Sequence, residues 1–292
     1  MIAGKGGMNL EINWFPGHMA KTLRELQQHM QQVDLVFETC DARIPESSRN
    51  PELNRLLGTK PRLLVLNKSD LADPAITKIW LEWYRSQGVT ALACDSKKRS
   101  GLAALNQAAI DMNRGKTEKA LARGRIFRPV RVMVAGIPNT GKSTLINTLC
   151  GRKSAMTADR PGVTKQISWI RTKGQLDLLD SPGVLWPRLG SGLQQLRLAA
   201  TGAIRDDLLP LEEIAAGGLV LLARLYPELI RSRFHLDNLE LPGFKLLEAA
   251  AQRRGCLMSG GRTDNLRFAA LFLDELRSGA IGRISLERPS DS

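Results

Sequence analysis

The feature that most constrains this fold is the octapeptide GIPNTGKS at residues 136–143. It has the pattern GxxxxGK[ST], with the apolar segment RPVRVMVAG before it and the helical segment KSTLINTLC starting at its lysine. A glycine-rich loop between a buried strand and a helix lets backbone N–H groups surround phosphates, and the helix N-terminus adds partial positive charge. The sequence therefore predicts a phosphate-binding loop, and a glycine turn with a surface lysine is the disfavoured alternative.

Each polar residue of this loop has an expected role in nucleotide binding. Lys142 should reach the β- and γ-phosphates, and the Ser143 hydroxyl is the natural Mg²⁺ ligand. Four neighbours complete the predicted nucleotide contacts: Asn139, Thr140, Gly141 and Thr144. ATPases share this loop, so it does not by itself select a base.

A second motif points to guanine. Asn67-Lys68-Ser69-Asp70 follows the apolar run PRLLVL and matches NKxD, in which the aspartate accepts two hydrogen bonds that guanine offers and adenine does not. A buried site built for such bonds rejects the wrong base by about 10⁴–10⁵. Lys68 should lie along the base and Asn67 should tether a neighbouring loop. An ATPase or nucleotide kinase with a chance NKSD is the competing interpretation.

Two further loops fit the same site. The segment CDSK at 94–97 occupies the position where GTPases often carry Ser-Ala-Lys, and we assign Ser96 to the base side. The segment DSPG at 180–183 matches DxxG, so Asp180 should hold Mg²⁺, directly or through water, and Gly183 should sense the γ-phosphate. Thr164 is the candidate switch threonine that completes Mg²⁺ coordination, with an ordinary surface threonine as the alternative.

Strands alternating with helices predict an α/β fold with a mostly parallel sheet. Strands are expected at 33–40, 61–66, 89–94, 128–136, 166–172 and 175–180, and helices at 18–31, 73–87 and 101–113. The basic segment 114–127 is either a linker or an exposed helix. Beyond residue 187 only helical spacing is evident, so we predict a P-loop GTPase domain at 1–187 and a smaller all-α domain at 188–292.

The motifs occur in rotated order, because the base-binding loops precede the phosphate loop. A domain tolerates such permutation when its original termini lie close together, and residues 112–128 would be the new join. With NWFPGHMAK at 13–21, this order closely resembles the circularly permuted ribosome-biogenesis GTPases of the YlqF/RbgA type. The resemblance implies that the protein acts late in assembly of the large (50S) ribosomal subunit and hydrolyses GTP slowly until the pre-ribosome stimulates it. It also implies that the helical domain at 188–292 binds ribosomal RNA.

The hydrolytic machinery is less clear from the residues. Val184 stands where small signalling GTPases carry the glutamine that orients the attacking water, and it cannot form a hydrogen bond. The resemblance implies that His18 takes this task, and local packing or helix capping is an equally weighted alternative. It also implies that Asn139 helps to bind K⁺, unless this asparagine is simply a loop former. Lys142, Thr164 and His18 are thus the predicted catalytic residues.

Charge and composition limit the partners. The net charge is +13, and residues 97–131 carry ten basic and two acidic side chains, which indicate either a solvated face or a polyanionic partner, meaning RNA or a ribonucleoprotein. The resemblance implies that this partner is the large-subunit precursor, with its ribosomal RNA and proteins. Four cysteines without a CxxC pair indicate a reducing compartment. No apolar run suits a membrane helix, so we expect no membrane partner. The cysteine usage leads us to expect a cytoplasmic protein, and we expect it to be a monomer. A non-catalytic protein that senses GTP or GDP while binding RNA is the alternative function.

Overall fold

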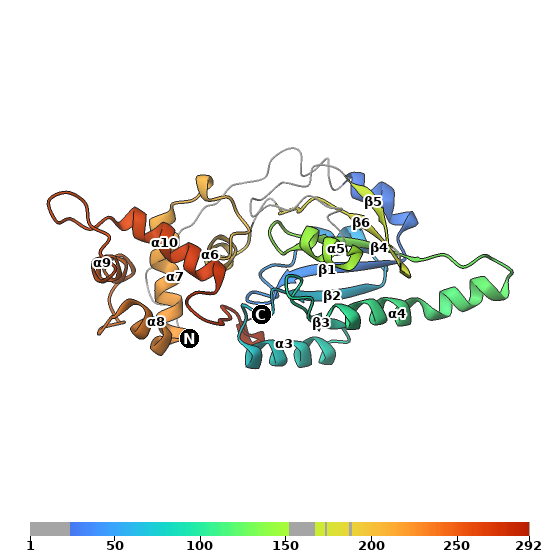
Figure 1. Ribbon diagram of the computed structural model, residues 1–292, viewed down its shortest axis with the longest axis horizontal. Coiled ribbons are helices and arrows are strands. Elements are labelled where there is room, and N and C mark those ends of the chain that lie inside the picture. The colour runs from blue at the N-terminus through green and yellow to red at the C-terminus, as the bar shows by residue number, and fades with distance from the viewer. Residues whose placement is uncertain (1–23, 152–166, 173, 187–188, 292) are drawn as a thin grey trace. The chain divides into compact units, whose positions relative to one another are not determined.

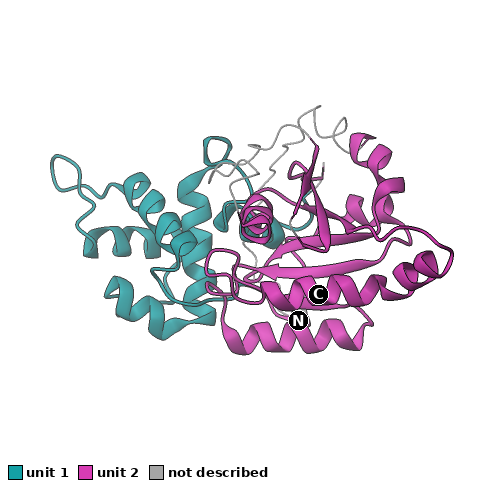
Figure 2. Cartoon of the chain, turned by 45° about the vertical axis from the view of Figure 1, so that its right-hand side comes forward, with its two compact units in different colours: residues 1–13, 188–286 teal, residues 14–187, 287–292 magenta. Residues whose placement is uncertain are grey.

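The computed structural model describes residues 24–151, 167–172, 174–186 and 189–291. The chain divides into two compact units, one within 14–187 together with 287–292, and the other within 188–286 (Figure 2). The sequence-based boundary placed everything beyond residue 187 in the helical domain. The structure instead joins the segment from Glu287 onward to the α/β unit.

The α/β unit is built on a six-stranded sheet with the order β3-β2-β1-β4-β6-β5 (Figure 1). All neighbouring strands are parallel except β5, which runs antiparallel to β6. This arrangement confirms the predicted α/β fold with a mostly parallel sheet. The strands are β1 (Leu35–Asp41), β2 (Arg62–Asn67), β3 (Ala91–Ala93), β4 (Val130–Gly136), β5 (Ser168–Arg171) and β6 (Leu176–Asp180).

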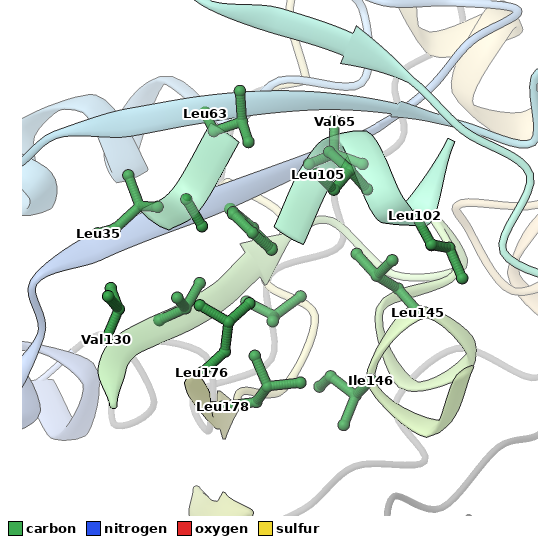
Figure 3. Packing of buried hydrophobic residues seen from close by; sticks show 14 of the residues in the cluster. Leu35, Leu63, Val65, Leu102, Leu105, Val130, Leu145, Ile146, Leu176 and Leu178 are labelled. Atoms are coloured by element: carbon green, nitrogen blue, oxygen red, sulfur yellow. The ribbon is translucent and has the colours of Figure 1, made fainter. Parts of the chain in front are cut away.

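The central strands β1 and β4 are buried along almost their whole length and are mostly apolar, because helices cover both faces of the sheet. Figure 3 shows one face, where Leu35 and Leu178 from the sheet meet Leu105 and Leu145 from helices α4 (Leu102–Ala122) and α5 (Lys142–Cys150). On the other face, Trp80 of α3 (Pro74–Ser86) packs with its helix neighbours against β1 and β2. The sheet is therefore a rigid platform for the loops at its edge.

Helix boundaries follow local chemistry. The Asp73 side chain caps α3 by accepting hydrogen bonds from the N–H groups of Ala75 and Ile76, with Pro74 as the first helical residue. Helix α4 continues to Ala122, well beyond the predicted end at residue 113. Residues 114–122 are rich in alanine, lysine, glutamate and leucine, which favour the helix without tertiary support. Of the two alternatives for 114–127, the exposed helix is thus correct for its first part.

The helical unit contains no strand among its described residues, only an isolated bridge between Leu257 and Thr263. Its aromatic core joins Phe234, Phe268 and Phe272. No helix in the described part of the chain is long and apolar enough to span a bilayer. The helices are α6 (Gly192–Ala200), α7 (Leu211–Leu225), α8 (Pro227–Phe234), α9 (Gly243–Arg253) and α10 (Asn265–Ser278).

Candidate nucleotide-binding site

The rotated motif order leaves all base and phosphate loops at one sheet edge. Strands β1, β2, β3, β4 and β6 are parallel, so their carboxyl ends meet there. NKSD follows β2, CDSK follows β3, GIPNTGKS follows β4 and DSPG follows β6. Ligands of open α/β sheets bind at this edge, outside the carboxyl ends of the strands. The sheet topology thus compensates for the permutation of the sequence.

The phosphate loop needs glycine where the backbone passes close to its neighbours. Gly141 has φ +86°, and a Cβ added to it would collide with the Asn67 amide. A Cβ on Gly136 would lie 2.5 Å from the carbonyl oxygen of Thr39. Asn139 also has a left-handed backbone, at φ 59°, which asparagine tolerates better than most residues. The close approach of protein atoms therefore requires glycine at both positions of the motif.

Lys142, the lysine of this loop, is buried at the start of α5. Its Nζ donates a hydrogen bond to the Ile137 carbonyl at 2.6 Å. Burial lowers the pKa of Lys142 to about 8, and the nearby Asp180 carboxylate opposes that shift. The loop therefore holds a desolvated cation that electrostatic contact with an anion would stabilise.

Asp180 ends β6 as a buried carboxylate. Its Oδ1 has no hydrogen-bond partner among the described residues. Burial raises the pKa of Asp180 to about 6, against the opposing effect of the Lys142 ammonium. The described residues contain no cluster of three histidine, cysteine or carboxylate side chains. A single unsatisfied carboxylate beside a phosphate loop fits Mg²⁺, which commonly takes one or two carboxylates together with phosphates and waters.

Asn67 connects three loops through its side chain. Its Nδ2 donates to the Thr140 carbonyl at 2.8 Å, and its Oδ1 accepts from the Ser96 N–H at 3.2 Å and hydroxyl at 2.8 Å. The Ser96 carbonyl in turn accepts from the Thr148 hydroxyl of α5 at 2.9 Å. The base-side loops and the phosphate loop therefore form one hydrogen-bonded assembly, with Ser96 beside NKSD as its position in the sequence suggested.

The two charged residues of NKSD differ in their surroundings. Asp70 is half-buried at the loop, whereas Lys68 adopts φ 58° and places its Nζ 3.1 Å from the Asp41 carboxylate. Arg43 donates to both oxygens of Asp41, at 3.0 and 2.8 Å. Asp41 and Arg43 were not among the predicted site residues. A carboxylate that ends a buried apolar strand, as Asp180 does, was the sequence signal that could have identified Asp41.

Not every predicted residue has a side chain available to contact a phosphate. The Thr140 hydroxyl donates to the Ile137 carbonyl at 3.1 Å and lies 2.7 Å from the Thr39 hydroxyl, so it is engaged inside the fold. Only the backbone of Thr140 remains for phosphate contacts. Ser143 and Thr144 are half-buried in the first turn of α5.

The DSPG segment lies directly against the phosphate loop. A Cβ on Gly183 would come within 2.7 Å of the Pro138 Cα and 2.8 Å of the Lys142 Nζ. The next residue, Val184, is 1% exposed, and its N–H donates to the Gly136 carbonyl at 3.3 Å. Its aliphatic side chain therefore serves the core. Of the three predicted catalytic residues, Lys142 lies in the phosphate loop, whereas His18 and Thr164 lie outside the described residues.

Comparisons with known proteins agree with this geometry. A family model described as 50S ribosome-binding GTPase matches residues 131–216. The chain is 42% identical over 284 residues to ribosome biogenesis GTPase A of Priestia megaterium. This match covers 97% of this chain and 99% of that relative. GDP-bound TM YlqF matches with 28% identity and a TM-score of 0.68, covering 92% of this chain and 100% of that one. GNP-bound YlqF from T. maritima matches with 26% identity and a TM-score of 0.64, covering 92% of this chain and 98% of that one.

Proposed function

The chain belongs to the ribosome biogenesis GTPase A family, and from that premise we propose how its own residues bind nucleotide, hydrolyse it and engage the ribosome. The protein binds GTP and GDP, and it hydrolyses GTP in ribosome assembly. The observation that carries the detailed proposal is the Asn67 side chain. It forms hydrogen bonds with Thr140 of the phosphate loop and with Ser96 of the CDSK loop, so the loops expected to bind the base and the phosphates are joined to each other.

Guanine selection belongs to Asp70, with Lys68 along the base and Asn67 and Ser96 shaping the loops around it. The triphosphate lies on the phosphate loop, where Lys142 supplies the cation. Backbone N–H groups of Asn139, Thr140, Gly141 and Thr144 surround the phosphates. Gly183 approaches the γ-phosphate through its backbone amide, and its closeness to Pro138 and Lys142 of the phosphate loop supports this role.

Two ions would complete the site. Ser143 and Asp180, together with Thr164, would hold Mg²⁺, which when bound would supply positive charge beside the phosphate oxygens. The orphaned Oδ1 of Asp180 supports that assignment. K⁺ would be the second ion, and Asn139 would contribute to its binding in the phosphate loop.

Hydrolysis requires a group that positions water, and Val184 is buried in the core. We assign that role to His18, which approaches the γ-phosphate when the precursor of the large ribosomal subunit binds. Turnover is therefore slow in the free protein and faster on the particle. The partner is this late 50S precursor, with ribosomal RNA and proteins contacted by a monomer in the cytoplasm.

The decisive experiment measures GTP hydrolysis in K⁺ buffer with and without purified large-subunit precursors. We expect stimulation by the particles, GTP-dependent co-sedimentation and loss of stimulation in His18→Ala. Full stimulation of His18→Ala would remove this histidine from the mechanism. Absence of any stimulation would favour the alternative of a GTP- and GDP-sensing RNA-binding switch.

Base selectivity is tested separately by competition of ATP and GDP against a labelled guanine nucleotide. Asp70→Ala should abolish the preference for guanine, because an unmatched site no longer rejects adenine. Equal competition by ATP in the wild-type protein would contradict the assignment of NKSD. Glu240→Ala, an exposed carboxylate of the helical unit, is the matched control.

A further inference from the structure

Helix α4 changes character halfway along its length. Its buried residues recur every three or four positions, at Leu102, Leu105, Ala109 and Asn113. Continuing the same spacing beyond Asn113 leads to basic residues, which are Lys116, Lys119 and Arg123. At 3.6 residues per turn these three side chains fall within a sector of about 60°, adjoining the buried stripe. The side of the helix that packs on the sheet in its first half is therefore cationic in its second half.

The second half of α4 and the loop after it form an exposed segment, residues 114–127, which we call the α4 arm. Figure 1 shows α4 running on past the end of the sheet. Residues 121–128 are all exposed, and Asn113 is the last buried position of the helix. Nothing in the core of the α/β unit requires these additional turns.

The cations of the α4 arm are largely uncompensated. Between residues 114 and 128 there are six basic residues, and Glu118 is the sole carboxylate. Arg114 pairs with Asp111, and Arg128 pairs with Asp34. The other four form no ion pair with any described residue: Lys116, Lys119, Arg123 and Arg125. Lys116 nevertheless lies near enough to Asp34 to help lower the pKa of that carboxyl. Surface charges on helices are commonly balanced by opposite charges three or four residues away, and such balance is missing here.

Two apolar side chains lie at the end of the α4 arm. Ile126 is 93% exposed and Phe127 is 52% exposed. An aromatic ring next to several arginines is the combination that single-stranded nucleic acid recognises, because bases stack on the ring while phosphates contact the cations. A membrane-binding helix would need a broad apolar face, whereas this arm offers Leu121, Ile126 and Phe127 beside its cations.

We propose that the α4 arm is an RNA-binding element of the GTPase unit, in which Lys116, Lys119, Arg123 and Arg125 contact backbone phosphates and Phe127 stacks on an unpaired base. This inference rests on the proposed function, since ribosomal RNA is the ligand. It adds a second RNA contact, beyond the one expected of the helical unit. The three helical cations span a stripe about 10 Å long, at 1.5 Å per residue.

The test compares two triple variants with equal loss of charge. The arm variant is Lys116→Gln, Lys119→Gln and Arg123→Gln. The control is Arg55→Gln, Lys78→Gln and Arg85→Gln, which removes three exposed cations from helices α2 (Pro51–Leu57) and α3 of the same unit. Binding of GTP-loaded protein to deproteinised large-subunit rRNA is measured between 50 and 300 mM KCl. Unchanged GDP affinity shows that each variant is folded.

Each phosphate contact contributes about 0.7–0.9 to the slope of log K against log salt. The arm variant should therefore lose about 2–3 units of slope and bind on the order of 100-fold more weakly at 0.1 M salt. The control should match the wild type. Phe127→Ala should weaken binding about fivefold to a hundredfold at every salt concentration without changing the slope, because stacking releases no counterions.

The outcomes separate this inference from the proposed function. If wild-type protein binds rRNA and the arm variant keeps the same slope, the inference is wrong while the proposed function stands. If the arm variant binds rRNA normally and loses affinity for intact particles alone, the arm contacts an acidic protein and the inference is also wrong. If the wild type binds neither rRNA nor particles, both fail together.

Discussion

The Nζ of Lys68 lies 3.1 Å from the carboxylate of Asp41, and the two residues come from the ends of neighbouring parallel strands. Burial alone would raise the pKa of Asp41, but the charges of Arg43 and Lys68 outweigh it and hold that pKa well below its usual range. Burial lowers the pKa of Lys68, and Asp41 opposes the shift. A buried carboxylate outside the NKSD motif therefore holds the lysine of that motif in place.

Asp41→Asn should impair both stability and nucleotide binding. Replacing Asp41 takes from Arg43 and Lys68 the carboxylate that they share, and breaking a buried ion pair by removing one partner costs about 3–5 kcal/mol in the free energy of unfolding. GDP and GTP affinities should fall by a similar factor of about ten, equivalent to roughly 1.4 kcal/mol. Urea unfolding and fluorescent-nucleotide titration measure the two effects.

The matched control is Asp34→Asn, which breaks the more exposed pair with Arg128 and should cost at most about 1 kcal/mol. In a Lys68→Met background, Asp41→Asn should weaken nucleotide binding much less, because the lysine it positions is gone. Equal effects in both backgrounds would mean that Asp41 acts independently of Lys68.

Acid should remove the contribution of Asp41. A carboxyl whose pKa is depressed in the folded state stabilises the protein above its unfolded pKa, near 3.9, and this stabilisation is lost as pH falls further. The difference in unfolding free energy between wild type and Asp41→Asn should be constant from pH 8 to 5 and shrink below about pH 4. A difference that persists unchanged at pH 3 would show that charge is not its origin.

Gly183→Ala should disturb the phosphate end of the site. The new Cβ would lie 2.7 Å from the Pro138 Cα, so the DSPG segment and the phosphate loop must separate. Such overpacking costs about 1–3 kcal/mol, and it displaces Lys142, whose Nζ is 2.8 Å away. We expect GTP affinity to fall more than GDP affinity. Gly174→Ala is the control, since its nearest contact is at 3.6 Å; identical behaviour of both variants would contradict the proposal.

Glu287 ties the C-terminal segment to the α/β unit. Its carboxylate accepts from the Ser47 N–H at 3.0 and 3.1 Å, and its carbonyl accepts from the Trp80 indole at 3.1 Å. Glu287→Ala removes a charged acceptor and should lower the free energy of unfolding by about 1.5–3 kcal/mol. Thermal and urea unfolding check this, with the exposed Glu228→Ala as control. A loss no greater than in the control would mean that the segment is held by other contacts.

The sequence by itself determined the chemistry of the site and the class of fold. NKSD, GIPNTGKS and DSPG are contiguous strings whose roles depend on a strand before them, and apolar runs mark those strands clearly. Their rotated order was also readable, because motif order is a property of the chain alone. Even the position of Ser96 followed from its place after a predicted strand.

The tertiary structure decided the contacts between residues distant in sequence. Glu287 and Ser47 are 240 residues apart, and no local pattern indicates that the chain end returns to the sheet. The support of Lys68 by Asp41 likewise depends on the register of β1 with β2, which pairs Asp41 with Asn67. Helix propensity continues α4 beyond Asn113, its last buried residue. Only the tertiary structure shows that this second part of the helix runs past the end of the sheet (Figure 1). Local motifs specify which groups can bind a nucleotide, whereas packing in three dimensions specifies which charges support them.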